Sequence, residues 1–268
     1  MLGNIPSLQL ECPEATMNLR RSIHTLCGAF LLSCSLAVGA QTSTYNVGVT
    51  AAAIPLTYLD PKTNTLQGAM IDVIRAIAVD AGFNVNLQAT PFAALIPALA
   101  GNRIDIIGAA MLITAPRRDA VDFSDPVFAY PEGLVVNVSD KTAYRSLADL
   151  KGQVVGAQTG TVYVDFLKRA GQFAEIKLYP SLADVLREIS QGRLTAGFGD
   201  APILNYLLAQ NVSLRARLVS TYESKLPGNI GIAVRKGDSE LLGKINTSLA
   251  KLRADGTIDK ILDDWNLR

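Results

Sequence analysis

Two arginines, Arg117 and Arg118, stand close behind a long apolar run that breaks at Thr114. The stretch "DIIGAAMLITAPRRDAVDFSDPV", residues 105–127, has the composition of a buried strand up to that break. A solvated loop and a carboxylate-binding site both fit such a pair. Ligands of open α/β domains lie beyond the carboxyl ends of strands, and a planar guanidinium can donate two parallel hydrogen bonds to a carboxylate.

Two further strand ends carry polar groups. The stretch "GAQTGTVYVDF" passes from a strand into a helix through Gly160 and Thr161. Free N–H groups at a helix N-terminus attract an anion, but the same residues also suit ordinary helix capping. Asp200 ends the stretch "LTAGFGD", where it can cap a helix that begins at Ala201.

The elements that position these groups follow an N-terminal leader. Residues 17–40 have the pattern of a secretory signal peptide, with two arginines before an apolar stretch and the small residues Val38 and Ala40 before Gln41. We expect residues 1–40 to form a leader and the signal peptide to be cleaved near Ala40/Gln41, which gives a periplasmic protein. A membrane anchor and a lipoprotein attached through Cys34 are the alternatives.

The composition of the expected mature protein excludes several kinds of chemistry. The 268 residues include 25 basic and 24 acidic groups, so the charge balance does not suggest a nucleic-acid partner. The histidine and all three cysteines lie in the leader (His24, Cys12, Cys27 and Cys34). Disulfides, thiol nucleophiles, zinc sites and imidazole bases are therefore not expected after Gln41, and neither a metal nor another cofactor is predicted.

The rest of the chain predicts two α/β lobes of similar plan. Apolar strands alternate with amphipathic helices, which is typical of mainly parallel sheets covered on both faces. Two extended apolar stretches, 133–140 and 229–238, are interpreted as hinge strands that join the lobes around a ligand cleft. We place lobe 1 at residues 44–134 plus 232–268 and lobe 2 at residues 138–228. The expected strands are 45–50, 84–89, 103–110, 153–158, 175–180 and 194–200, and the expected helices are 69–82, 92–101, 161–171, 181–192 and the C-terminal region 239–268.

Four stretches in this order give the chain its family resemblance: "PFAALIPALAGNRIDII", "ITAPRRDAVDFSDPV", "VVGAQTGT" and "LRADGTIDKILDDW". Over residues 45–268 the sequence resembles the periplasmic amino-acid-binding proteins of ABC importers, the solute-binding family 3 group with a type II periplasmic binding fold. The resemblance implies a protein that closes around a small ligand and presents it to a membrane permease.

The same resemblance implies roles for individual residues. Arg117, in a Thr-x-x-Arg motif with Thr114, would grip the α-carboxylate of the ligand, and Thr161 with the amide of Val162 would hold the same group from the second lobe. Asp200 would receive the α-ammonium. The remaining expected contacts are the Ala110 carbonyl with the ammonium and the Phe92 ring with the ligand side chain, although Phe92 also reads as an ordinary core residue.

Several positions depart from the family pattern. Leu112 stands where a hydroxyl usually contacts the ammonium, which favours a hindered or substituted amine. Thr50 stands where binders of basic amino acids carry an aspartate, and Ala53 replaces an aromatic residue. Because a cationic side chain would be desolvated there without a partner, lysine, arginine and histidine are disfavoured. Gln158 occupies a position that can carry lysine in glutamine binders.

These residues predict a non-enzymatic, monomeric substrate-binding component of an ABC transporter, with a polar amino acid or related small zwitterion as ligand and no nucleic-acid partner. Two other functions remain open. The family also resembles cyclohexadienyl dehydratase, an enzyme on the same fold, in which a carboxylic acid of the cleft eliminates water. A ligand-sensing module would use the fold to signal through a partner.

Overall fold

The computed structural model describes residues 42–226 and 228–267. Residues 41–268 form a compact unit by themselves, and the description below concerns this unit. The leader and cleavage site expected from the sequence lie outside the described residues.

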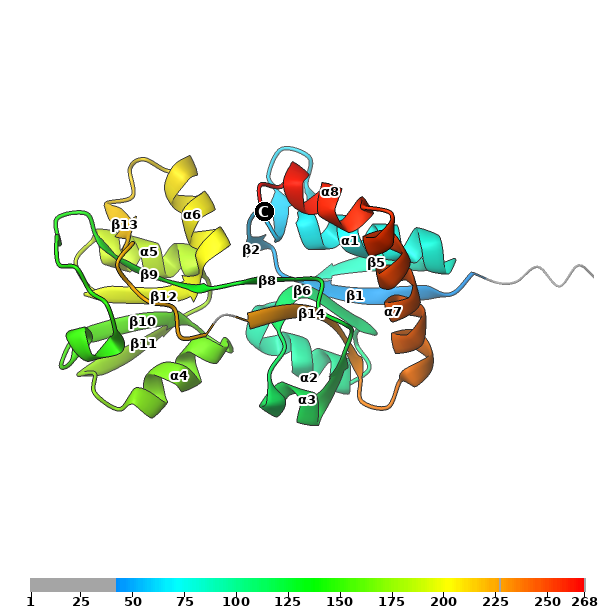
Figure 1. The fold of residues 1–268 in the computed structure, drawn as a ribbon, viewed down its shortest axis with the longest axis horizontal. Coiled ribbons are helices and arrows are strands. Elements are labelled where there is room, and N and C mark those ends of the chain that lie inside the picture. The colour runs from blue at the N-terminus through cyan, green and yellow to red at the C-terminus, as the bar shows by residue number, and fades with distance from the viewer. Residues whose placement is uncertain (1–41, 227, 268) are drawn as a thin grey trace, which may run out of the picture. The chain divides into compact units, whose positions relative to one another are not determined.

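The first sheet combines parallel and antiparallel strands in the order β5-β1-β6-β14-β7, with β8 paired to β14 (Figure 1). Strand β1 runs parallel to β5 and β6, whereas β14 returns antiparallel from the far end of the chain. The expected apolar strands are confirmed. The strands are β1 (Thr44–Val49), β5 (Asn84–Ala89), β6 (Ile106–Leu112), β7 (Val121–Phe123), β8 (Phe128–Tyr130) and β14 (Gly228–Arg235).

Helices cover both faces of this sheet. The expected apolar stripe of α1 is buried, and the helix ends at Gly82, whose φ of 72° places it in the left-handed region that favours glycine. A smaller apolar cluster lies under α2 on the other face, around Leu95 and Met111. The helical elements of this lobe are α1 (Ala69–Ala81), the 3₁₀ helix η1 (Phe92–Ala94), α2 (Leu95–Ala100), α3 (Ala115–Ala120), α7 (Ser239–Ala254) and α8 (Thr257–Asp264).

The second sheet repeats the plan with the strand order β11-β10-β12-β9-β13. Strand β10 is parallel to β11 and β12, while β9 and β13 are antiparallel members. Ser181 caps α5, because its hydroxyl accepts from the amide of Asp184 at 3.2 Å. The elements are β9 (Glu132–Asn137), η2 (Leu147–Leu150), β10 (Val154–Gln158), α4 (Val162–Ala170), β11 (Glu175–Tyr179), α5 (Leu182–Ser190), β12 (Ala196–Asp200), α6 (Ala201–Gln210) and β13 (Ala216–Leu218).

The structure corrects some expected boundaries. Strand β6 begins at Ile106 rather than at residue 103, because the amides of Arg103 and Ile104 both donate to the carbonyl of Ala98 in the turn after α2. The residues after Thr114 form the short helix α3 and not a loop. A small sheet was also not expected, since its strands are too short to show an alternating pattern: β2 (Ala52–Ala53), β3 (Thr57–Asp60) and β4 (Thr65–Gln67).

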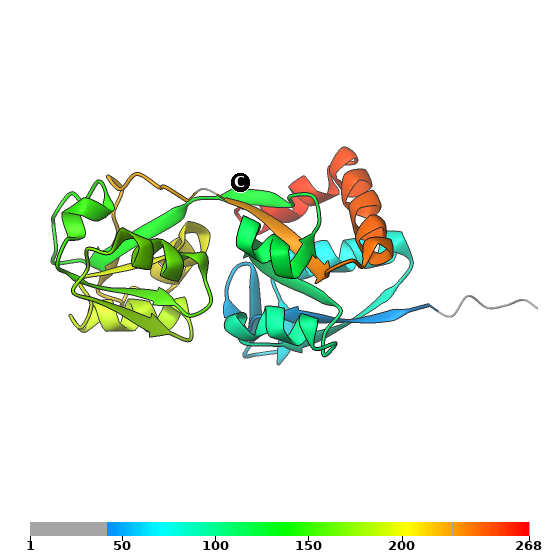
Figure 2. The same cartoon turned by 90° about the horizontal axis from the view of Figure 1, so that it is seen from below.

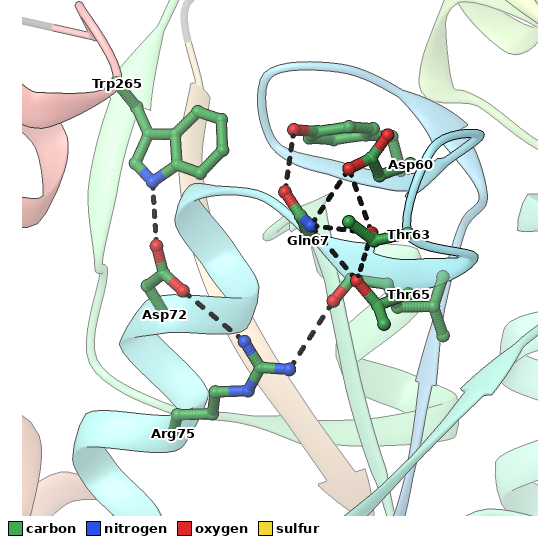
Figure 3. A network of polar contacts seen from close by, with 9 residues as sticks. Asp60, Thr63, Thr65, Gln67, Asp72, Arg75 and Trp265 are labelled. Carbon is green, nitrogen blue, oxygen red and sulfur yellow. Dashed lines mark hydrogen bonds and ion pairs between the residues drawn. The ribbon is translucent and has the colours of Figure 1, made fainter.

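Polar contacts fasten this small sheet and the C-terminal residues to α1 (Figure 3). The indole of Trp265 donates to Asp72 at 2.9 Å, and Arg75 lies 3.7 Å from the same carboxylate while it reaches the carbonyl of Leu66 at 3.5 Å. Gln67 continues the network toward the turn between β3 and β4. The segment that follows β1 is therefore held in place by the first lobe itself.

The chain crosses between the two sheets twice, from β8 to β9 and from β13 to β14 (Figures 1 and 2). The buried carboxylate of Glu132, the first residue of β9, ties the two crossings together. It accepts from the amides of Lys225 and Leu226 at 2.5 and 2.7 Å and from the hydroxyls of Tyr222 and Ser224. A buried carboxylate is tolerated only with such partners.

Glu132→Gln should lower the free energy of unfolding by about 2 to 4 kcal/mol, because the amide NH₂ cannot accept the hydrogen bonds that the carboxylate accepts and buried donors lose their partner. Urea denaturation measures this change. Glu223→Gln is the matched control: Glu223 pairs with Lys225 at 3.1 Å but is 68% exposed, so its loss should cost less than about 0.5 kcal/mol. Equal effects of the two substitutions would contradict the assignment of Glu132.

Candidate functional site

Arg117 lies where the carboxyl end of β6 meets the start of α4. Its position follows from α3, whose N-cap Thr114 accepts from the amide of Arg117 at 3.4 Å. The guanidinium donates to the carbonyl of Leu112 at 2.8 Å and to the carbonyl of Gly160 at 3.1 Å, and it lies 5.5 Å from the centre of the Phe92 ring. Arg117 therefore joins groups from both lobes.

The neighbouring Arg118 is different. Its side chain is exposed and lies 6.0 Å from the ring of Phe123. Arg118 is therefore solvated, while Arg117 is partly buried. Burial lowers the pKa of Arg117, and the negative charge of Asp200 opposes this effect.

The loop before α4 approaches the first lobe closely. Gly160 has a φ of +80°, and a Cβ at this position would lie 2.7 Å from the Cα of Ala93. Only glycine fits this approach without strain. Thr161 is the N-cap residue of α4, but its buried hydroxyl donates to the carbonyl of Gln158 at 2.7 Å and does not cap the helix. The capping interpretation of Thr161 is thus wrong for its side chain.

A cavity of about 290 Å³ adjoins Arg117 and the first turn of α4. Val162, as the first residue of α4, brings an N–H that the helix itself leaves unpaired. The cavity thus offers a guanidinium and a helix N-terminus, both of which favour an anion. Its lining includes Leu112, Thr114, Arg117, Thr161, Val162 and Asp165.

Asp200 ends β12 and stands at the N-cap position of α6, but its side chain does not cap that helix. The hydroxyl of Tyr163 donates to its Oδ1 at 2.5 Å. Tyr130, whose hydroxyl donates to the carbonyl of Ala110, is a polar neighbour that favours the charged carboxylate. Burial raises the pKa of Asp200 to about 6, although the two tyrosines and Arg117 act in the opposite direction. The carboxylate is therefore costly to ionise where it stands.

Ala110 has a backbone conformation that is rare for a residue with a Cβ. Its φ is +52°, and its carbonyl accepts from the hydroxyl of Tyr130 at 3.3 Å. Positive φ at a non-glycine residue costs energy and is concentrated at functional sites. Leu112 is buried beside Gly228, where a Cβ would lie 1.9 Å from its Cδ2.

Two of the predicted site residues, Thr50 and Gln158, are hydrogen-bonded to other residues of the protein. The hydroxyls of Thr50 and Thr57 are 2.7 Å apart in a buried pair. Gln158 donates to the carbonyl of Pro180 at 3.1 Å. The geometry brings together the other predicted residues through Arg117 and the two tyrosines: Phe92, Ala110, Leu112, Arg117, Thr161, Val162 and Asp200.

Tyr130 and Tyr163 were not predicted as residues of the site. Both are almost fully buried, with 5% and 1% of their surface exposed, and a buried tyrosine needs a hydrogen-bond partner for its hydroxyl. Tyr163 stands in the first turn of α4, three residues after Gly160, so its position at a strand-to-helix junction was the available signal. Tyr130 had no comparable signal, because only the fold places it beside Ala110 and Asp200.

The described residues contain no group of three or more histidine, cysteine, aspartate or glutamate side chains that could hold a metal ion. In the same part of the chain, the helices are all too short or too polar to cross a bilayer.

The raised pKa of Asp200 predicts a pH dependence of stability. The native protein keeps this proton up to about pH 6, whereas an unfolded aspartate loses it near pH 4, so the free energy of unfolding should fall as the pH rises between these values. The contribution of Asp200 is on the order of 2 to 3 kcal/mol. Urea denaturation of the protein and of Asp200→Asn at pH 4.5 and pH 7 tests this. The difference between them should change with pH in this direction, and a constant difference would contradict it.

Comparison with known proteins shows which family the chain matches. The model of the family "bacterial extracellular solute-binding proteins, family 3" matches residues 45–268. The ABC transporter arginine-binding protein 1 of Escherichia coli (strain K12) is 31% identical over 223 residues, which cover 82% of this chain and 89% of that protein.

Two solved structures are similar in fold and sequence. An ancestral arginine-binding protein bound to glutamine has a TM-score of 0.77 and 36% identity, covering 84% of this chain and 99% of the other. The ancestral amino acid-binding protein AncCDT-1, described as a precursor of cyclohexadienyl dehydratase, has a TM-score of 0.75 and 31% identity, with 83% and 95% covered.

Proposed function

The chain belongs to the bacterial extracellular solute-binding proteins, family 3, and we propose that it is the substrate-binding component of an ABC importer. Its ligand is a polar amino acid or a related small zwitterion, which it binds by closing the two lobes. The observation that carries this proposal is the position of Arg117, whose guanidinium reaches carbonyls of both lobes next to a cavity. A guanidinium at such a junction can bind a carboxylate while the lobes close around it.

The proposal assigns residues that line the cavity to the carboxylate of the ligand, and two residues outside its lining to the nitrogen. Arg117, Thr161 and the amide of Val162 take the carboxylate, and Asp200 with the carbonyl of Ala110 takes the nitrogen. The 7% exposure of Leu112 and its place in the cavity lining support a contact with the ligand carbon skeleton. Phe92 stacks on Arg117 and limits how the guanidinium can turn.

Further parts of the proposal concern the whole protein. The sequence places lobe 1 at residues 44–134 plus 232–268 and lobe 2 at residues 138–228. Because β9 (Glu132–Asn137) belongs to the second sheet and β14 (Gly228–Arg235) to the first, we propose lobe boundaries just before Glu132 and just before Gly228. The protein acts as a monomer in the periplasm after cleavage near Ala40/Gln41, and it delivers its ligand to a membrane permease. The intact mass of the exported protein tests the cleavage site, since lipid on Cys34 would give a different mass.

Catalysis is the second candidate function. It has one observation in its favour, because a carboxylic acid with a pKa of about 6 beside two tyrosines can act as a general acid. The relative AncCDT-1 is itself an amino acid-binding protein, and this supports a non-enzymatic role here. Recovery of the bound ligand unchanged after prolonged incubation, measured by mass spectrometry, supports binding alone; a dehydrated product would establish the enzyme.

Arg117→Ala should lower the affinity for amino acids by about 2 to 5 kcal/mol, because the ligand carboxylate loses its charged partner in a desolvated site. Isothermal titration calorimetry with the ligand that gives the largest shift in a thermal screen of L-amino acids measures the loss. Arg118→Ala is the control, since Arg118 is exposed and should leave the affinity within a factor of about two. Equal losses in both variants would place the carboxylate elsewhere.

Thr50→Asp should raise the affinity for L-arginine relative to L-glutamine by about tenfold or more. The buried pair of Thr50 and Thr57 offers no charge to a cationic side chain, and a carboxylate there would supply the missing partner. Competition between the two amino acids, followed by calorimetry, gives the ratio directly. Thr63→Asp, in the exposed turn between β3 and β4, adds the same charge away from the cleft and should leave the ratio unchanged.

A further inference from the structure

The cavity beside Arg117 extends beyond the first turn of α4. Val162, Asp165 and Arg169 all line it, and residues with this spacing lie on one face of a helix. At 1.5 Å per residue, the backbone of Arg169 lies about 10 Å farther along the helix axis than that of Val162. The cavity therefore follows α4 for about two turns, farther than the carboxylate of a ligand requires.

Much of the remaining lining is apolar. Its uncharged members come from the end of β6, the start of α3 and the second crossing between the lobes, and they include Leu112, Ile113, Pro116, Leu226 and Gly228. Such residues favour contact with hydrocarbon. The volume of about 290 Å³ corresponds to on the order of ten water molecules at about 30 Å³ each. The cavity thus has room for a ligand side chain as well as a carboxylate.

Two opposite charges line the cavity beyond the first turn of α4. Asp165 and Arg169 are exposed, and neither side chain forms a hydrogen bond or an ion pair with another residue in the described part of the chain. Asp165 is close enough to Arg117 for its negative charge to favour the charged guanidinium and raise its pKa. This part of the cavity therefore offers a ligand one acidic and one basic group.

This pair of charges is complementary to a second amino-acid head group. A carboxylate can accept hydrogen bonds from the guanidinium of Arg169, and an ammonium can donate to the carboxylate of Asp165. A second carboxylate alone would suit Arg169 but would be repelled by Asp165, and a second ammonium alone would meet the reverse problem. A head group that carries both charges satisfies both residues.

We propose that the ligand is an amino acid whose side chain ends in a second amino-acid head group, with the second carboxylate on Arg169 and the second ammonium on Asp165. The carbon chain between the two head groups lies against Leu112 and Pro116, and the first carboxylate binds Arg117. The inference rests on the proposed function, because the first head group occupies the site assigned there to an amino acid.

Calorimetry with four matched ligands tests the second head group. LL-diaminopimelate carries the second ammonium and the second carboxylate, L-lysine lacks that carboxylate, L-α-aminopimelate lacks that ammonium, and L-norleucine lacks both. Diaminopimelate should bind about tenfold more tightly than norleucine, and the two ligands with one extra charge should gain less. Equal or tighter binding of norleucine, or binding of other L-amino acids but none of these four, overturns the inference and leaves the proposed function intact. If no L-amino acid binds, both fail.

Variants connect each charge of the second head group to its residue. Arg169→Gln should weaken diaminopimelate and aminopimelate about fivefold without weakening lysine or norleucine, and Asp165→Asn should weaken diaminopimelate and lysine about fivefold without weakening aminopimelate. Lys168→Gln is the matched control, because Lys168 is exposed on the same helix but outside the cavity lining. Equal weakening of all four ligands by Asp165→Asn would mean that Asp165 acts only through Arg117. That result, or unchanged affinity for diaminopimelate in both variants, overturns the assignment.

Discussion

The partly buried guanidinium of Arg117 is the group on which the arrangement of the site depends. A positive charge away from bulk water needs partners, and the structure supplies two carbonyls, the ring of Phe92 and the nearby charge of Asp200. One carbonyl belongs to the end of β6 and the other to the loop before α4. Satisfying this single side chain therefore requires that the carboxyl ends of both sheets face each other.

That requirement explains local features that would otherwise look unrelated. The loop at Gly160 can approach the first lobe because this residue has no Cβ, and Thr161 turns its hydroxyl back to Gln158 instead of capping α4. The helix N-terminus then stays open beside the cavity. In the proposed function, a carboxylate that enters there meets donors from both lobes.

The two charged groups of the site, Arg117 and Asp200, have different surroundings. Arg117 retains free N–H groups, whereas the buried carboxylate of Asp200 accepts from Tyr163 and is expensive to ionise. The buried carboxylate of Glu132, in contrast, accepts hydrogen bonds from four donors in residues 222–226. It joins the two crossings between the lobes, so they enter the second sheet together.

The sequence alone determined the fold class, the strand and helix order, and the identity of Arg117, Thr161 and Asp200 as candidate ligand contacts, because hydrophobic periodicity and short motifs are local properties of the chain. It also separated Arg117 from Arg118. Tertiary structure decided what local patterns do not carry. The hydroxyl pair of Thr50 and Thr57, the conformation of Ala110 and the hydrogen bond of Tyr163 to Asp200 arise from side-chain contacts and backbone strain that only the assembled sheets impose. The positions of Arg117 and Asp200 at strand ends could therefore be predicted from the sequence, but their hydrogen-bond partners could not.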